Sequence, residues 1–401
     1  MTIEVDFPNM SLAAQVMTRQ QGHAQAVSTH LQTYAQLSAQ DMGMVLQIFQ
    51  PINQALVDVG CQIMSYSGQG FELGADKMNQ SIQAYVDADR KTYEEFRQVL
   101  TDLGIDTPPY SPPAPVTLGD AGDRATAQYS MADGNLYNQA FWDGYQAAQW
   151  LDRTATGLGQ RAGDALSATR TVAEAVDASS FLTPPQVEDP EVENIRWSAG
   201  LILGGVDWIF EQIFGYSLLE EITKPFSGDW VRMKEASTAW VHTGDALTAM
   251  GQNTSGMVPA LASWTGAGSE AFLVASALVA EAHLALQGPA STIATVIKLI
   301  AALAKATVAL ILKLLEFIQT ELLKIAAEAA IPVGGWVLAA VNGVVAAAEL
   351  VTQVRNAYTL INLLYDFVAT ATTGLDQLIN ARLIMVDLVE GLVRAGVARS
   401  V

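Results

Sequence analysis

Residues 262–272, ASWTGAGSEAF, interrupt a chain whose flanking sequence has the periodicity of long helices. Small and apolar residues before this stretch recur at alternating spacings of three and four. They are Trp230, Met233, Ser237, Trp240, Gly244, Leu247, Gly251, Thr254, Val258 and Leu261. A second series with the same spacing follows, made up of Phe272, Ala275, Val279, Ala282 and Leu286. Each series lies on one face of a helix, and the first predicts a helix roughly 50 Å long.

An apolar helical face must be buried, and the nearest partner is the helix that follows it in the chain. The stretch 262–272 therefore predicts a tight turn between two antiparallel helices. Gly266 can adopt the positive φ that ends a helix, and Ser269 is the expected N-cap of the second helix. Trp264 is expected to cover the end of the apolar face beneath the turn. A structural role for Trp264 and Gly266 is favoured over direct contact with another protein, although the two roles are compatible.

The first hundred residues show the same helical spacing twice. One series consists of Ala13, Met17, Gln20, Ala24, Val27, Leu31 and Tyr34, and the other of Phe71, Ala75, Met78, Ile82 and Tyr85. These series predict a second antiparallel helical pair. The apolar segment 41–64 lies between them and contains Pro51. It predicts a separate third helix, kinked or broken, that packs against the pair.

Proline-rich breaks divide the chain. Five prolines fall within residues 108–115, where they exclude a helix and predict an extended linker. A second break combines prolines with acidic residues at 181–194. The expected regions are a helical module at 1–104, a linker with a helical segment at 105–187, a helical hairpin with a lead-in at 188–290, and an apolar helical region at 291–401. The predicted fold class is all-α, with elongated antiparallel hairpins and bundles.

The chain is strongly acidic, which bears on its partners. Its 401 residues include 41 acidic and 21 basic side chains, for a formal net charge of -20. This balance argues against nucleic acid and anionic lipid surfaces as partners.

Cys61, the single cysteine, excludes an intrachain disulfide and is expected to be buried and unreactive. The first ten residues, MTIEVDFPNM, have neither the basic nor the apolar region of a Sec signal peptide, so if the protein leaves the cell, it is expected to do so by another route.

Residue patterns typical of enzymes are missing from the sequence. The four histidines, His23, His30, His242 and His283, have no metal-ligand spacing and are expected on helix surfaces or between helices. No Gly-x-Ser-x-Gly elbow and no phosphate-binding glycine loop occurs. The sequence therefore predicts a protein that is not an enzyme and that has no cofactor, no metal site and no catalytic residue.

Several motifs together resemble a known group of exported proteins. GDW at 228–230, AW at 239–240 and WTGAGSEAF at 264–272 resemble the WXG-type helical hairpins of actinobacterial type VII (ESX) secretion substrates. The first hundred residues are similar to EspC-like modules, which end in a Tyr-x-x-x-Asp/Glu signal, and YVDAD at 85–89 matches that signal. The order of the two modules is similar to that in the N-terminal part of mycobacterial channel-and-toxin proteins. The resemblance implies tandem WXG-like modules that act by protein recognition and assembly.

The resemblance also implies an export signal at Tyr85 and Asp89. Residues four apart share a helical face, and here they lie near the end of a helix and before a flexible linker. The same loose pattern occurs at Tyr129 and Tyr216, so the position of Tyr85 is what favours it. In this group the Trp-x-Gly end of a hairpin is thought to complete the signal together with the tail of a partner helix.

Partners and location follow from the same resemblance. The implied partners are the ATPase of the type VII machinery and a small WXG-type protein. A homo-oligomer and a membrane stay open as further partners. The implied location is extracellular or at the cell surface, by a Sec-independent route, and association with an outer membrane stays open. The chain could be the export module of a polymorphic toxin.

The apolar C-terminal third supports two interpretations. Residues 331–348 carry no charge, and their length is at the lower limit for a transmembrane helix. In one interpretation, helices at 291–328 and 333–355 belong to a water-soluble bundle, which the regular charges of 298–328 favour. In the other, the apolar helices 291–355 insert into a membrane, and the protein is a channel or translocation component.

Overall fold

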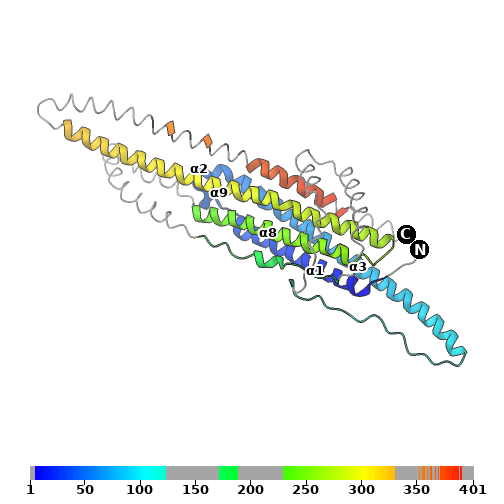
Figure 1. Cartoon of the computed structure of the whole chain (residues 1–401). Helices are drawn as coiled ribbons and strands as arrows, with labels where there is room; N and C mark the ends of the chain where they lie inside the picture. Colours follow the sequence, from blue (N-terminus) through cyan, green and yellow to red (C-terminus); the bar gives the residue numbers. More distant parts are fainter. Residues whose placement is uncertain are drawn as a thin grey trace.

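The computed structural model describes residues 5–122, 171–187, 229–329 and, with gaps, 352–390. Within these ranges the regular secondary structure is helical and includes no strand, which confirms the predicted all-α class. Four long helices make up most of the described chain, and they lie side by side in Figure 1. They are α1 (Phe7–His30), α3 (Gln50–Asp102), α8 (Trp230–Ala260) and α9 (Ala267–Ala329).

Aspartates begin two of these helices. The Asp6 carboxylate accepts a hydrogen bond from the Asn9 backbone N–H at the start of α1, 3.1 Å away. Asp229, the middle residue of the GDW motif, accepts one from the Arg232 N–H at the start of α8, also at 3.1 Å. Such side chains satisfy N–H groups that have no partner within the helix and lie at the positive end of the helix dipole. The GDW motif thus has a local structural reason for its aspartate.

The region around Pro51 differs from the prediction of a separate helix at 41–64. Residues of this segment are divided between a short helix α2 (Ala39–Leu46), the 3₁₀ turn η2 (Gln47–Phe49) and the first part of α3. Pro51 lies in the first turn of α3, where its missing N–H costs no hydrogen bond and its fixed φ suits a helix. It therefore starts one continuous helix of 53 residues and does not interrupt it.

The helices of each pair run antiparallel. In α8 and α9, contacts join Ser237 to Ala294 and Gly251 to Leu284, so one residue number falls as the other rises. A Cβ at Gly251 would lie 2.7 Å from Leu284 Cγ and 2.9 Å from the Ala280 carbonyl oxygen. Only glycine allows α8 to lie this close to α9. For α1 and α3, Gly74 lies close to Met17 of α1, and Gly60 lies close to Leu31, which directly follows α1, so these two helices also run in opposite directions.

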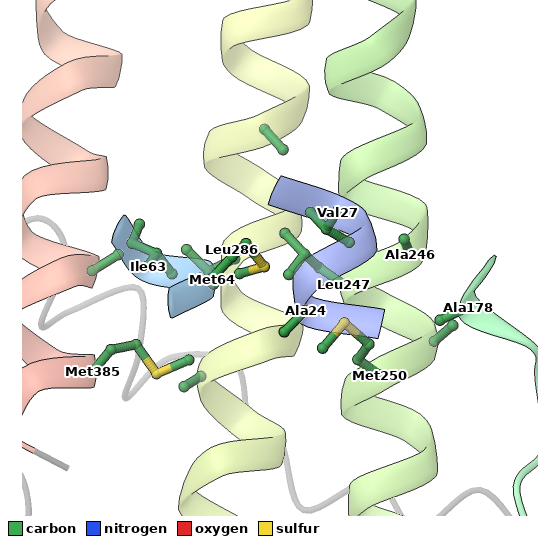
Figure 2. Packing of buried hydrophobic residues seen from close by; sticks show 14 of the residues in the cluster. Ala24, Val27, Ile63, Met64, Ala178, Ala246, Leu247, Met250, Leu286 and Met385 are labelled. Carbon is green, nitrogen blue, oxygen red and sulfur yellow. The ribbon is translucent and has the colours of Figure 1, made fainter. Parts of the chain in front are cut away.

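All four long helices share one apolar core. Figure 2 shows Val27 of α1, Met64 of α3, Leu247 of α8 and Leu286 of α9 packed together. The apolar members of the predicted α8 series at Met233, Trp240, Leu247, Val258 and Leu261 are all buried, with Trp240 at 1% exposure. The residue series found in the sequence therefore identify the faces that form this core.

Residues 171–177, which form no helix, lie against both α1 and α8 and are held there by polar side chains. Asn9 accepts a hydrogen bond from the Val172 N–H at 2.8 Å, and Asn253 accepts from Ala175 at 2.9 Å. Glu174, buried at 1% exposure, accepts hydrogen bonds from Arg19 and Gln20 of α1. Burial raises the pKa of Glu174, and Arg19 opposes this shift. A buried carboxylate is tolerated here because it is paired and hydrogen-bonded.

The helix α9 crosses position 291 without a break, so the helix expected to begin there begins at Ala267. Pro289 lies inside it. The expected helix at 333–355 and the uncharged run 331–348 fall outside or almost wholly outside the described residues. Among the described residues, one helical segment, Ala271–Ala302, is long and apolar enough to cross a membrane by length and composition. Over half of its most apolar window, 56%, is buried inside the protein.

His283 lies in the core between α9 and α3 and is fully buried. Its ring nitrogens lie 2.6 Å from Ser67 Oγ and 2.7 Å from the Val279 carbonyl oxygen, and its ring packs on Phe71 at 5.2 Å. Burial lowers the pKa of His283 to about 4. Since the folded-state pKa lies below the ordinary value of about 6.5, the unfolded chain binds a proton at this histidine before the folded protein does as the pH falls. The free energy of unfolding is therefore unaffected at neutral pH and decreases as the pH falls from about 6.5 towards 4.

We therefore expect acidification from pH 7 to pH 5 to lower the free energy of unfolding by about 2 kcal/mol through His283 alone. Urea unfolding at the two pH values measures this loss. In His283→Gln the loss should be smaller by that amount, whereas in the exposed-residue control Lys77→Gln it should equal that of the unaltered protein. Glu174, which titrates in the opposite sense, contributes equally in all three proteins. An equal loss in His283→Gln would contradict the prediction.

Candidate functional site

Tyr85 lies on α3 where that helix leaves the bundle. The side chains before it in its series, Phe71, Ala75 and Met78, are buried, and Ile82 and Tyr85 are partly buried against the core. Asp89, one turn further along, is exposed. Figure 1 shows the rest of α3 projecting beyond the other long helices. The predicted signal thus spans the boundary between the covered and the uncovered part of α3.

Trp264 and Gly266 lie in the turn between α8 and α9. The Trp264 backbone N–H donates to the Leu261 carbonyl at 3.0 Å, and its ring is buried at 3% exposure, 5.9 Å from the Phe272 ring. Gly266 has φ of 125°, in the region that favours glycine. Because α8 ends at Ala260, Gly266 does not end that helix but directly precedes α9.

The predicted N-cap at Ser269 is wrong. α9 begins at Ala267, so Ser269 lies inside its first turn, with its side chain buried at 3% exposure. The physical reason is the positive φ of Gly266, which reverses the chain earlier than a serine cap would require.

The structure brings three of the four predicted site residues into one neighbourhood. The Trp264 indole N–H donates to the Tyr85 hydroxyl at 3.4 Å, a long and therefore weak hydrogen bond between residues 179 apart in sequence. Gly266 is two residues beyond Trp264. A carboxylate at Asp89 lies one helical turn beyond Tyr85. The turn of the α8–α9 pair and the end of the covered part of α3 are therefore adjacent.

Asp89 has a partner that the sequence did not predict. The Tyr110 hydroxyl donates to Asp89 Oδ2 at 3.0 Å. The Arg90 guanidinium lies over the Tyr110 ring at 5.7 Å, and the Tyr93 ring lies 5.6 Å from it. Desolvation and the hydrogen bond to Asp89 raise the pKa of Tyr110, which keeps the hydroxyl protonated as a donor. The proline-rich segment thus folds back along α3.

Sequence reasoning missed Tyr110 because the segment around it has no helical period to follow. The prolines at 108–115 predicted an extended chain, and the segment is free of regular structure. Tyr93 fixes its course by donating from its hydroxyl to the Pro108 carbonyl at 2.6 Å. The available signal was Tyr110 itself, an aromatic residue inside the proline run, since a tyrosine can pack on a helix while donating a hydrogen bond.

The other reactive side chains lie apart from this neighbourhood. Cys61 is half-buried, with its thiol donating to the Ser28 carbonyl at 3.7 Å, and burial raises its pKa. The ring centroids of His30 and His242 lie 5.7 Å apart. Burial is the main cause that lowers the pKa of His30 to about 4, and the neighbouring His242 lowers it further. Among the residues that the structure describes, no group of three or more His, Cys, Asp or Glu is placed to hold a metal ion.

The turn can be tested with two glycines that differ only in backbone conformation. A Cβ at Gly266 or at Gly22 would meet no atom within 4 Å, but only Gly266 has a positive φ. Gly266→Ala should therefore lower the free energy of unfolding by about 1–2 kcal/mol. Gly22→Ala, inside α1, should raise it by roughly 0.5–1 kcal/mol. Urea unfolding compares the two, and equal effects would contradict a strained turn at Gly266.

Comparison of the chain with protein-family models, with curated proteins and with solved structures gives no match. The resemblance to type VII secretion substrates therefore rests on the sequence motifs.

Proposed function

We propose that this protein is a type VII (ESX) secretion substrate of the WXG-type and EspC-like group, built of tandem helical-hairpin modules that act by protein recognition. The observation that carries the proposal is the hydrogen bond of the Trp264 indole to the Tyr85 hydroxyl. Two motifs chosen separately, one for its Trp-x-Gly turn and one for its Tyr-x-x-x-Asp spacing, meet at a single place. A receptor could read both of them together.

The two parts of the site have different roles in this proposal. Trp264 is buried, so its ring holds Tyr85 in position. Asp89 is exposed and offers a carboxylate that can accept several hydrogen bonds or pair with a basic side chain. The proposed receptor is a component of the secretion machinery, such as its ATPase, and export follows a Sec-independent route. The same proposal allows a further member in the assembly: a small WXG-type protein, a second copy of this chain or a toxin domain.

Export measured in a host with the matching secretion system tests this function. Tyr85→Ala and Asp89→Ala should each reduce the secreted fraction at least tenfold, because each removes part of the recognised face. Asp87→Ala is the matched control, since Asp87 is an exposed aspartate on the same helix but on another face. Unfolding midpoints of all variants should stay close to that of the unaltered protein. Undiminished secretion of folded Tyr85→Ala and Asp89→Ala would refute the export signal.

A second candidate function is membrane insertion of the apolar helices, in which the protein acts as a channel or translocation component. The observation in its favour is the apolar segment Ala271–Ala302 of α9. Insertion would require α9 to leave α8, because the two helices bury each other. Insertion and export are compatible, since an exported protein can insert afterwards.

A reversible cross-link between α8 and α9 tests this second function. In a Cys61→Ser background, Ser237→Cys and Ala294→Cys join the two helices where the Ser237 hydroxyl donates to the Ala294 carbonyl at 2.7 Å. If the protein inserts, it should release dye from phosphatidylcholine vesicles when reduced and at least tenfold less when cross-linked. Failure of the reduced protein to release dye, or equal release by both forms, would contradict insertion through opening of this pair.

A further inference from the structure

The apolar series of α3 continues beyond the bundle into solvent. The covered part runs through Phe71, Ala75, Met78, Ile82 and Tyr85. The same spacing then continues without a slip through Asp89, Thr92, Phe96, Val99 and Leu103, which we call the outer seam. Phe96 is 67% exposed, Val99 57% and Leu103 70%. Large apolar side chains repeated on one face of a helix are usually buried against another helix.

One flank of the outer seam is already occupied by the chain itself. Tyr93 packs against Tyr110, and the Leu100 carbonyl accepts a hydrogen bond from the Ile105 N–H at 2.9 Å. Both residues lie on the same side of the outer seam, about 60–80° from its centre. A partner helix must therefore lie along the seam towards its other flank.

That other flank is acidic. Glu95 and Asp102 are exposed there, about 80–100° from the seam centre, and Asp89 lies within the seam. The basic residues of this part of α3, Arg90, Lys91 and Arg97, lie further away, about 120–140° from the centre. The positions beside an apolar helical seam select a partner by charge.

We propose that the outer seam is a docking surface for a partner helix whose apolar seam is flanked by lysine or arginine. The apolar side chains would pack on Phe96, Val99 and Leu103, and the basic flank would face Glu95 and Asp102. A basic side chain opposite Asp89 would share its carboxylate with Tyr110. Because the outer seam includes Asp89, this assignment deepens the proposed function and rests on it for its role in export.

A second copy of this chain fits the surface less well. Pairing of two outer seams in antiparallel orientation would bring Glu95 and Asp102 of one copy beside the same residues of the other, and like charges at these positions repel. The net charge of -20 adds to that repulsion.

Two synthetic helical peptides test the docking surface on the full chain. Both contain three heptads with the same leucine and isoleucine seam, one with lysine and the other with glutamate at the flanking positions. Fluorescence anisotropy at low salt should show the lysine peptide binding at least tenfold more tightly than the glutamate peptide, with the difference shrinking as salt is added. Equal affinity, or no measurable binding of either peptide, would overturn the proposal.

Variants locate the binding. Phe96→Ser with Leu103→Ser should weaken binding of the lysine peptide at least tenfold, whereas Val241→Ser, at an exposed apolar residue of α8, should not change it. Glu95→Lys with Asp102→Lys should reverse the preference in favour of the glutamate peptide. Undiminished binding in the first variant would overturn the assignment. So would concentration-dependent dimerisation in sedimentation, or binding to phosphatidylcholine vesicles, that the same substitutions abolish.

The outcomes separate the docking surface from export. If Tyr85→Ala blocks secretion but the two peptides bind alike, the docking surface is wrong and the export signal stands. If the lysine peptide binds as expected but the Tyr85 and Asp89 variants are secreted normally, the proposed function is wrong and the docking surface stands.

Discussion

α8 and α9 approach so closely at Gly251 that a Cβ there would lie within 3 Å of both Leu284 and the Ala280 carbonyl oxygen. The rest of the described structure depends on this contact, because it fixes how the apolar series of the two helices interlock. The interlocked pair then sets the position of the turn that follows α8. Trp264 lies in that turn, and its buried ring donates a hydrogen bond to Tyr85 of α3, which is 179 residues earlier in the sequence. A change in the packing of α8 on α9 would therefore move the Trp264 ring relative to Tyr85.

The length of α3 decides where the exposed part of the site lies. α1, its antiparallel partner, has 24 residues, whereas α3 has 53. The part of α3 beyond Tyr85 therefore extends past the cover that α1 can provide. Tyr85 occupies the last covered turns, and Asp89 the first uncovered turn. A rigid helix places the carboxylate at a fixed distance from the bundle, which loops of the same composition could not do.

The sequence predicted the features that depend on periodicity and missed those that depend on single backbone positions. The alternating spacing of the α8 series identified its buried face because burial of one face is what that spacing reports. Pro51 was expected to break a helix and instead starts one, since proline suits the first turn of a helix but not its middle. Ser269 was expected to cap α9, but the helix begins directly after Gly266, whose φ is positive, three residues earlier than a cap at Ser269 implies.

The contacts of the candidate site were predictable only in part. Tyr85, Asp89, Trp264 and Gly266 were selected from local motifs, but no sequence spacing relates Trp264 to Tyr85. Their contact follows from how the two helical pairs pack. Tyr110 was not foreseen as the partner of Asp89, because prolines predict an extended backbone but do not indicate which helix that backbone packs against. In the folded protein, the packing of the Tyr93 and Tyr110 rings and the Tyr93 hydrogen bond hold this segment against α3.

The apolar side chains of α9 suit both candidate functions, because both the helical bundle and a membrane remove them from water. In the bundle, 56% of the most apolar window of this helix is buried inside the protein. The segment Ala271–Ala302 also contains Glu281 and Lys298, and each charge at the centre of a bilayer costs about 2.5–3.5 kcal/mol on insertion scales. Moving α9 into a membrane thus exchanges one apolar environment for another, adds the cost of these charges and exposes the apolar face of α8. The bundle is favoured in water for this reason, and insertion requires a second change that covers or removes the exposed face of α8.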